Sequence, residues 1–448
     1  MNMKNIMKVG AFAVAMFTAV SCSENETDIP QPGNNDGQVA LGVTTNLKVD
    51  AGTKAATRSV VVGTKITYNE SNYANNDSVP GIGIAILNKT KNAWYTPDGT
   101  NHTAYGTSHQ VWFVGDKAGA NWLSILAKNA TYADQEETPF YLKKEVGCVY
   151  AYYPYDATAF TSVTPSSETD MKVPANLLAT GAIDAQYANN AAMKWDDGTT
   201  KWVSNGSTSS ATRKQKIASL DEKDYMYHDA TVAAGRYVNN GHADGYPVVK
   251  PEADADNSNE NNPGWKIGLS MNHALAMVSF RVYDGGKLSN DNVTFKSFVI
   301  KNHASVTNFL GTGTMSLVDG TITTTGSSAT ITRNISNYIL KRQVETGESE
   351  HAFIATGTGL NAVSGKTVSK AVGALVYPLS FNENEIDVTV TLNDGANDMV
   401  FTVVLPAIEW LAGNNYIYTL MAGKNKLDVI SVDVTDWVDE EITDEIPL

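Results

Sequence analysis

The stretch Leu269-Ser-Met-Asn-His-Ala-Leu-Ala-Met-Val-Ser-Phe-Arg-Val282 decides how the chain folds. Apolar residues stand at every second position on both sides of His273, at Ile267, Leu269 and Met271 and then at Val278, Phe280 and Val282. This alternation is typical of β-strands with one buried face. We therefore predict two strands here, with His273 as a core or strand-end residue rather than a metal ligand.

Similar signals recur along most of the chain, separated by clusters of Gly, Asn, Thr and Ser. Long amphipathic helices are scarce. Short β-branched or aromatic runs lie at 82–87, 111–114, 146–154, 293–295, 298–300, 386–390, 400–405 and 427–434, and 193–203 reads as a hairpin turning at Asp197-Gly198. The fold class predicted is all-β, with two β-sandwich domains in tandem.

The length and one break in composition suggest where the domains divide. A chain of 448 residues exceeds what one hydrophobic core usually supports. The polar stretch from Pro251 to Pro263 is the clearest break in the middle of the chain. We expect an N-terminal sandwich over residues 59–262 and a C-terminal sandwich over residues 263–448.

The N-terminus has the layout of an export signal. Lys4 and Lys8 precede an apolar run from Val9 to Val20, which is too short to span a bilayer permanently. Residues 1–21 are therefore predicted to be a signal peptide. The sequence Ala19-Val-Ser-Cys22 resembles a bacterial lipobox, which makes Cys22 the expected lipidation site, acylated for example with palmitate. The alternative is an ordinary signal whose cleavage site happens to include a cysteine.

Residues 23–58 read as a tether followed by a strand. Residues 23–38 are polar, and Val39-Ala-Leu-Gly-Val43 then alternates, with Leu47 and Val49 continuing the pattern. The small residues 51–57 end on Arg58, and Ser59 begins a second short strand. Residues 22–58 thus lie between the expected lipidation site and the start of this second strand.

Charge and cysteine content exclude some partners. A formal net charge of −15 argues against nucleic acid or anionic lipid as a ligand. The chain has two cysteines, so lipidation of Cys22 would leave Cys148 with no disulfide partner. Cys148 lies in an apolar run and is expected to be a buried, inert thiol.

Fragments that imitate active sites depart from the required patterns. Gly359 to Thr367 resembles a phosphate-binding loop but has five residues between its glycines and leads into Ala374-Leu-Val-Tyr377, which reads as strand. Asp254 to Trp265 lacks the Gly and the Glu of a calcium loop. No HExxH or G-x-S-x-G motif occurs. We predict a protein that is not an enzyme, with no catalytic residues, metal or cofactor.

Four features in this order resemble the type V pilins, the fimbrillin family of Gram-negative anaerobes. The order is the Cys22–strand–Arg58 segment, then Val149-Tyr-Ala-Tyr-Tyr-Pro-Tyr155, then the strand-His-Ala-strand element around His273, and last Leu411-Ala-Gly-Asn-Asn-Tyr-Ile-Tyr418 with Val432-Asp-Val-Thr-Asp-Trp437. The resemblance implies two tandem transthyretin-like sandwiches. It also implies a precursor lipoprotein on the outer membrane that matures into a fimbrium on the cell surface.

The resemblance further implies how such subunits assemble. An Arg-specific surface protease would cut between Arg58 and Ser59, which makes residues 22–58 a lipidated propeptide with a removable first strand. Loss of that strand would open a groove in the N-terminal sandwich. The C-terminal strand of another subunit would fill that groove, giving a homopolymer that supports adhesion. The donor-strand candidates in this chain are Val429, Val432, Val434, Trp437 and Ile442.

Three roles stay open at this point. A stalk subunit would use both the removable strand and the donor tail. An anchor subunit would keep its lipid and first strand. A tip subunit or surface glycan-binding lipoprotein could use exposed aromatics, with Trp94, Tyr95, Trp195 and Trp202 as candidates, although core or hairpin packing is the commoner role for such residues.

Overall fold

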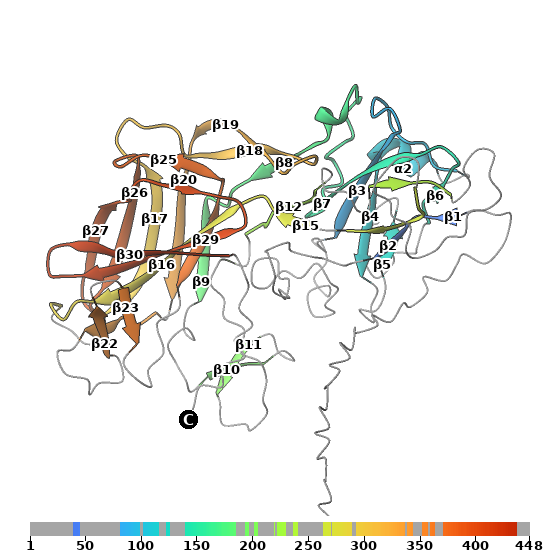
Figure 1. Ribbon diagram of the computed structural model, residues 1–448. Helices are drawn as coiled ribbons and strands as arrows, with labels where there is room; N and C mark the ends of the chain where they lie inside the picture. Colours follow the sequence, from blue (N-terminus) through green and yellow to red (C-terminus); the bar gives the residue numbers. More distant parts are fainter. Residues whose placement is uncertain are drawn as a thin grey trace, which may run out of the picture.

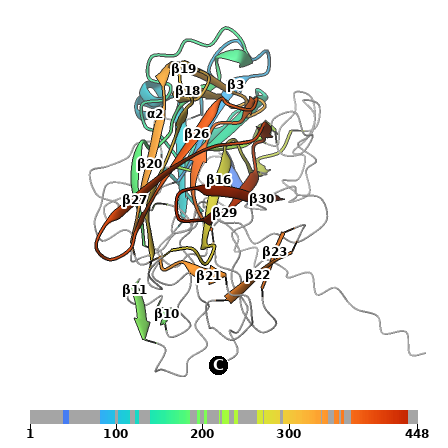
Figure 2. The same ribbon diagram turned by 90° about the vertical axis from the view of Figure 1, so that its left-hand side faces the viewer.

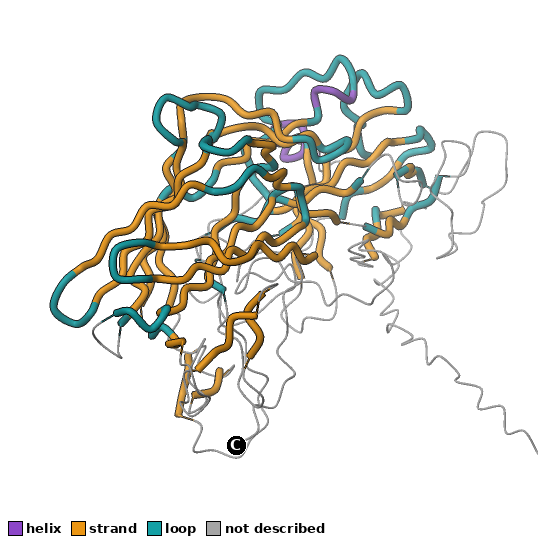
Figure 3. Tube along the Cα trace, turned by 60° about the vertical axis from the view of Figure 1, so that its left-hand side comes forward, coloured by secondary structure: helices purple, strands orange, loops and turns teal. Residues whose placement is uncertain are grey.

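The computed structural model describes residues 39–44, 81–98, 102–115, 122–125, 139–184, 193–196, 201–204, 219, 222–229, 236–240, 263–269, 271–288, 293–336, 338–343, 352–356, 359–362 and 371–436. Strands dominate this part of the chain, and its helical segments are the short α2 (His102–Ser108) and the 3-10 turn η2 (Glu168–Asp170) (Figure 3). The predicted all-β fold is confirmed. No helix among these residues is long and apolar enough to cross a membrane.

One sheet of seven described strands forms the N-terminal part of the molecule (Figure 1). Its strands pair in the order β15 (Met271–His273), β12 (Met226–His228), β7 (Gly147–Tyr153), β3 (Ile82–Asn88), β4 (Gln110–Gly115) and β5 (Trp122–Ile125), with β13 (Tyr237–Val238) also on β7.

The two central strands of this sheet are buried on both faces. Ile84 on β3 and Val149 on β7 face one apolar cluster, whereas Leu87 on β3 and Tyr150 on β7 face another. A strand covered on both sides must be apolar at nearly every position, which explains why these two runs do not alternate. Cys148 lies fully buried on β7, as predicted.

The C-terminal part is a sandwich of two sheets, one with seven and one with five described strands (Figure 2). The first contains β23 (Gly359–Ala362), β22 (Ala352–Thr356), β21 (Lys341–Gln343), β16 (Ala276–Asp284), β29 (Asn414–Ala422) and β30 (Leu427–Asp436), with β24 (Val372–Val376) also on β16. The second contains β27 (Asp398–Val404), β26 (Ile386–Asn393), β17 (Thr294–Asn302), β20 (Thr330–Ser336) and β9 (Thr180–Asp184).

Alternating residues from the two sheets fill the C-terminal core. The ring of Phe280 on β16 lies 4.8 Å from that of Phe298 on β17 and 5.7 Å from that of Tyr418 on β29. The alternation of Val278, Phe280 and Val282 that predicted a strand therefore points into this core.

A third apolar cluster joins the two parts of the molecule. It contains Tyr152 of β7 together with Met277 of β16 and Leu375 of β24, and it includes residues of a small third sheet. That sheet contains β19 (Ile322–Ser328), β18 (Leu310–Ser316) and β8 (Lys172–Asn176).

Strand pairing also crosses the expected division at residue 262. The strands β8 and β9 precede it yet pair with β18 and β20, and β15 follows it yet pairs with β12. The limits of the two domains stay a prediction. Two of the described two-stranded sheets are the hairpin of β10 (Met193–Asp196) with β11 (Lys201–Ser204), as predicted, and the pair of β25 (Leu379–Phe381) with β28 (Ile408–Trp410).

Buried polar pairs fix the segment that leads into β12. Asp224 is buried beside His273, with 2.8 Å between Asp224 Oδ2 and His273 Nδ1. His273 is thus a buried residue at the end of β15, as expected from the sequence. Glu222 accepts a hydrogen bond from Arg333 of β20, and both side chains are buried.

Candidate functional site

Residues 39–44 insert between two segments that are far apart in the sequence. The strand β1 (Val39–Ala40) pairs antiparallel with β6 (Tyr141–Leu142), and β2 (Gly42–Thr44) pairs parallel with β14 (Lys266–Gly268). At the junction, the Leu41 amide donates to the Phe140 carbonyl at 2.8 Å and the Gly42 amide donates to the Trp265 carbonyl at 2.9 Å. The segment therefore pairs with two strands, β6 and β14, that do not pair with each other in the described strand order.

The side chains of this segment are part of the N-terminal core. Leu41 and Val43 are each 3% exposed, and both belong to the cluster that contains Ile84, Val149 and Ile267. The alternation seen in the sequence therefore has its physical cause here, because both residues point into the cluster. Burying two such side chains contributes about 3–6 kcal/mol before ordering costs.

Removing the segment would leave a groove with unpaired backbone carbonyl groups and exposed apolar side chains. The carbonyl groups of Phe140 and Trp265 would lose their hydrogen-bond donors, and the apolar cluster would lose the two side chains that cover it. Unpaired strand edges beside exposed apolar groups favour addition of another strand. The sequence predicted the inserted strand but not its partners, because nothing local in residues 140–142 indicates pairing with a strand 100 residues earlier.

The processing residues predicted from the sequence lie outside the described part of the chain. This holds for Cys22, Arg58 and Ser59, and for the end of the predicted first strand at Leu47 and Val49. Their roles stay predictions.

The donor-strand candidates divide into two groups. Val429, Val432 and Val434 lie on β30, which pairs antiparallel with β29 at the end of its sheet. Val429 and Val432 pack against the C-terminal core, whereas Val434 is 54% exposed. Trp437 and Ile442 lie outside the described residues.

The aromatic candidates for sugar binding also divide. Tyr95 is fully buried, and its burial raises the pKa of the hydroxyl well above the usual value. Trp94 is half-buried, stacks on His109 with ring centroids 4.8 Å apart and donates through its indole N–H to the Val163 carbonyl. Trp94 and Tyr95 therefore both have packing roles, which the sequence analysis gave as the commoner role for such residues. The strands carrying Trp195 and Trp202 pair directly, but the positions of those side chains are not described.

The structure describes part of the segment that resembles a phosphate-binding loop, and it allows a search for metal-binding side chains. Gly359 begins β23, which pairs with β22, so the first residues of the phosphate-loop imitation form a strand. Among the described residues, no three His, Cys, Asp or Glu side chains come together as a metal site would require.

The architecture defines an all-β protein of several packed sheets whose N-terminal core is completed by an inserted strand. The family model described as fimbrillin-like matches residues 252–437 of the chain. This region is therefore fimbrillin-like, which confirms the resemblance seen in the sequence.

Solved structures that are similar to this chain come from Bacteroides and Porphyromonas species. A fimbrial protein from Bacteroides vulgatus is similar over 90% of this chain and 99% of its own, with 10% identity and a TM-score of 0.43. A protein assigned to cell adhesion from Bacteroides uniformis covers 90% and 100% at 16% identity and a TM-score of 0.42. The tip fimbrial protein Mfa3 from Porphyromonas gingivalis, truncated at its C-terminus, covers 81% and 90% at 10% identity and a TM-score of 0.30. No curated protein matches the sequence.

Proposed function

We propose that this chain is a stalk subunit of a cell-surface fimbrium. In this scheme it reaches the outer membrane as a lipoprotein modified at Cys22, is cut between Arg58 and Ser59, and polymerises when a tail strand of one copy enters the groove of another. The observation that carries the proposal is the insertion of residues 39–44, because Leu41 and Val43 fill the core from a segment that precedes the proposed cut.

The short pairing of this segment fits a strand that has to be exchanged. It makes two pairs with β6 and three with β14, far fewer than the nine pairs between β29 and β30. A strand with few ladder bonds can leave once the chain behind it is cut, and its two buried side chains keep the groove closed until then.

The position of β30 bears on which residues are donated. Val429 and Val432 hold β30 against its own core, so donating them would expose apolar surface in the donor. Val434 faces outward, and the chain continues for fourteen residues beyond it, including Trp437 and Ile442. We therefore favour donation by the part of the tail that begins near Val434.

N-terminal sequencing of fibres sheared from the cell surface tests the proposal. A stalk subunit processed as proposed begins at Ser59. Polymerised chains that still begin at lipidated Cys22 would instead indicate the anchor subunit, and an Arg58→Ala variant that assembles normally would support the same conclusion.

A further inference from the structure

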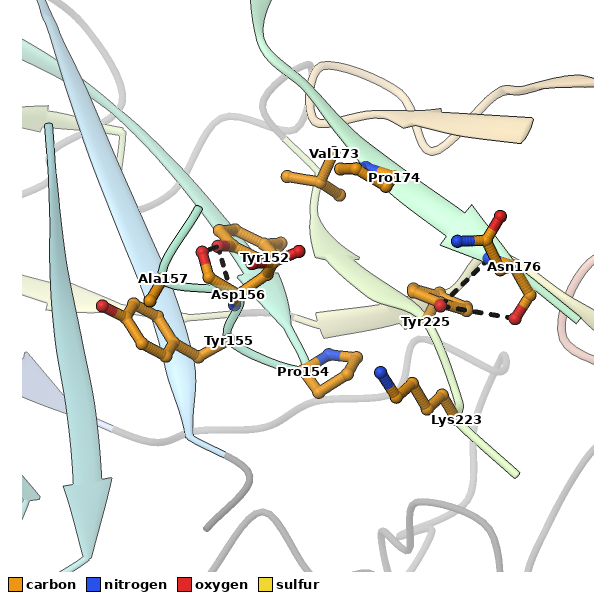
Figure 4. A pocket seen from close by; sticks show the side chains of 10 residues that line it. All are labelled: Tyr152, Pro154, Tyr155, Asp156, Ala157, Val173, Pro174, Asn176, Lys223 and Tyr225. Carbon is orange, nitrogen blue, oxygen red and sulfur yellow. Dashed lines mark hydrogen bonds between the residues drawn. The ribbon is translucent and has the colours of Figure 1, made fainter. Parts of the chain in front are cut away.

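The residues just before β12 connect the C-terminal sandwich to the N-terminal sheet. The strand β12 belongs to the N-terminal sheet and begins at Met226, directly after this segment. The side chains of Glu222 and Asp224 are buried, whereas Lys223 between them is exposed. Lys223 and Tyr225 border a pocket at the end of β7 (Figure 4). The two acidic side chains therefore make contacts inside the protein rather than with solvent.

Glu222 is bonded to both sheets of the C-terminal sandwich. Its Oε1 atom accepts from Arg333 of β20 in one sheet, and from the Leu375 amide of β24 in the other sheet at 2.7 Å. Arg333 also donates to the Leu178 carbonyl at 3.0 Å. Glu222 is 2% exposed and Arg333 is fully buried. Water therefore cannot take the place of either partner while the protein stays closed.

The other end of the segment is bonded where the chain passes between the two parts of the molecule. The strand β15 of the N-terminal sheet ends at His273, and β16 of the C-terminal sandwich begins at Ala276. Asp224 Oδ2 lies 2.8 Å from His273 Nδ1, and the Tyr225 carbonyl accepts from the Ala274 amide at 2.8 Å. The same short segment thus contacts both parts of the molecule.

We propose that the Glu222–Arg333 ion pair fixes the angle between the N-terminal sheet and the C-terminal sandwich. The apolar cluster that joins them opposes their separation, but burial of apolar surface is non-directional and tolerates small rotations. The ion pair does not tolerate them. A rotation that moves Glu222 away from Arg333 leaves two buried charges without partners, which is strongly unfavourable.

In a fibre assembled as proposed above, this angle sets how successive subunits are oriented. The candidate groove lies in the N-terminal core, and the proposed donor tail follows β30 of the C-terminal sandwich. A fixed angle between the two parts therefore gives a stiff and regular fibre. That consequence rests on the proposed function, whereas the ion pair acts within one subunit and can be tested there whether or not fibres form.

Double electron–electron resonance between two spin labels tests the proposal in the full-length chain. One label is placed at Ala93→Cys, which is exposed shortly after β3, and the other at Lys301→Cys, which is exposed on β17. Cys22→Ser leaves Cys148 as the one native thiol, and Cys148 is fully buried. The distance between the labels then reports the position of one part of the molecule against the other.

The test variant is Glu222→Gln with Arg333→Met. It removes both charges together, so neither is left buried alone, and the Gln side chain can still accept from the Leu375 amide. The matched control is Lys296→Met with Asp398→Asn, because that exposed ion pair lies within a single sheet, between β17 and β27.

We expect one narrow distance distribution for the labelled chain and for the control, and a distribution at least about twofold wider for the test variant. Glu222→Asp is a second, milder variant in case the first does not fold. It keeps the charge but is too short to reach Arg333 and the Leu375 amide together, so it should also widen the distribution. A broad distribution in the labelled chain without further changes overturns the proposal. Unchanged widths in the variants that fold, as judged by circular dichroism, also overturn it.

Discussion

Leu41 shows how one side chain couples the inserted segment 39–44 to the stability of the N-terminal core. Replacing it by Ala removes three buried carbon atoms and leaves a cavity, which in well-packed cores costs 2–5 kcal/mol. We expect Leu41→Ala to lower the free energy of unfolding by about 2–4 kcal/mol. Val39→Ala is the control, and it should cost less than about 1 kcal/mol because Val39 is only half-buried. Urea unfolding of both precursor variants measures the difference, and equal effects would contradict the inserted core role of Leu41.

Glu168 provides a second prediction at the residue scale, about pH. Partial burial acts to raise the pKa of its carboxyl, but hydrogen bonds from Lys91 and Tyr150 and the charges of Lys91 and Arg236 hold it below the usual value. A lowered pKa in the folded state gives stability that is present above the ordinary pKa of about 4.3 and is lost as pH falls through the lowered value.

The measurement is the melting temperature between pH 3 and pH 7. Glu168→Gln should melt lower than the unaltered chain at pH 7, and it should lose less on acidification because its neutral side chain cannot titrate. Glu409→Gln is the matched control, because Glu409 is exposed and lies outside the contacts of Glu168, so this variant should melt like the unaltered chain at pH 7. If the melting temperature of Glu168→Gln falls with pH in parallel with that of the unaltered chain, the interactions of Glu168 contribute no pH dependence to stability.

At the scale of elements, we expect that a separate peptide can take the place of the short inserted strand, residues 39–44. A chain that lacks residues 1–44 should expose the groove between β6 and β14 and bind a hydrophobic dye more strongly than the full-length chain. A peptide spanning residues 38–49 should reverse the dye binding by refilling the groove. The same peptide with Leu41→Asp and Val43→Asp should not, because both buried positions would carry charges. Rescue by both peptides would mean that the groove does not recognise these side chains.

The elements also show how far the sequence predicts the fold. The alternation around Phe280 and the runs on β3 and β7 indicated strands, because period and composition are local properties. The pairing of β8 with β18, about 140 residues later, left no local signal. Nor did the burial of Arg333, a charged residue whose partner Glu222 comes from a segment 111 residues away. The groove combines segments that are distant in the sequence, so the sequence indicated the inserted strand but not the site as a whole.

At the scale of the whole molecule, the proposed scheme assigns different roles to the two ends of the chain, and truncation of the C-terminal end tests its part. Deleting residues 437–448 leaves β30 and its pairing with β29 complete, so the shortened chain should fold and resist urea like the full-length chain. It should not polymerise after cleavage, because most of the proposed donor tail is absent.

Deleting residues 428–448 is the contrasting truncation. It removes β30 with Val429 and Val432, which pack on the C-terminal core, and should lower stability by several kcal/mol, on the order of 3–5. Gel electrophoresis of unheated, protease-treated samples reports the polymers, and urea unfolding reports the stability. If the chain without residues 437–448 still forms polymers, the tail beyond Asp436 is not the donor, and the tip role becomes the better account. If that chain is instead as unstable as the one without residues 428–448, the end of the tail belongs to the subunit's own core and its loss cannot be assigned to exchange between subunits.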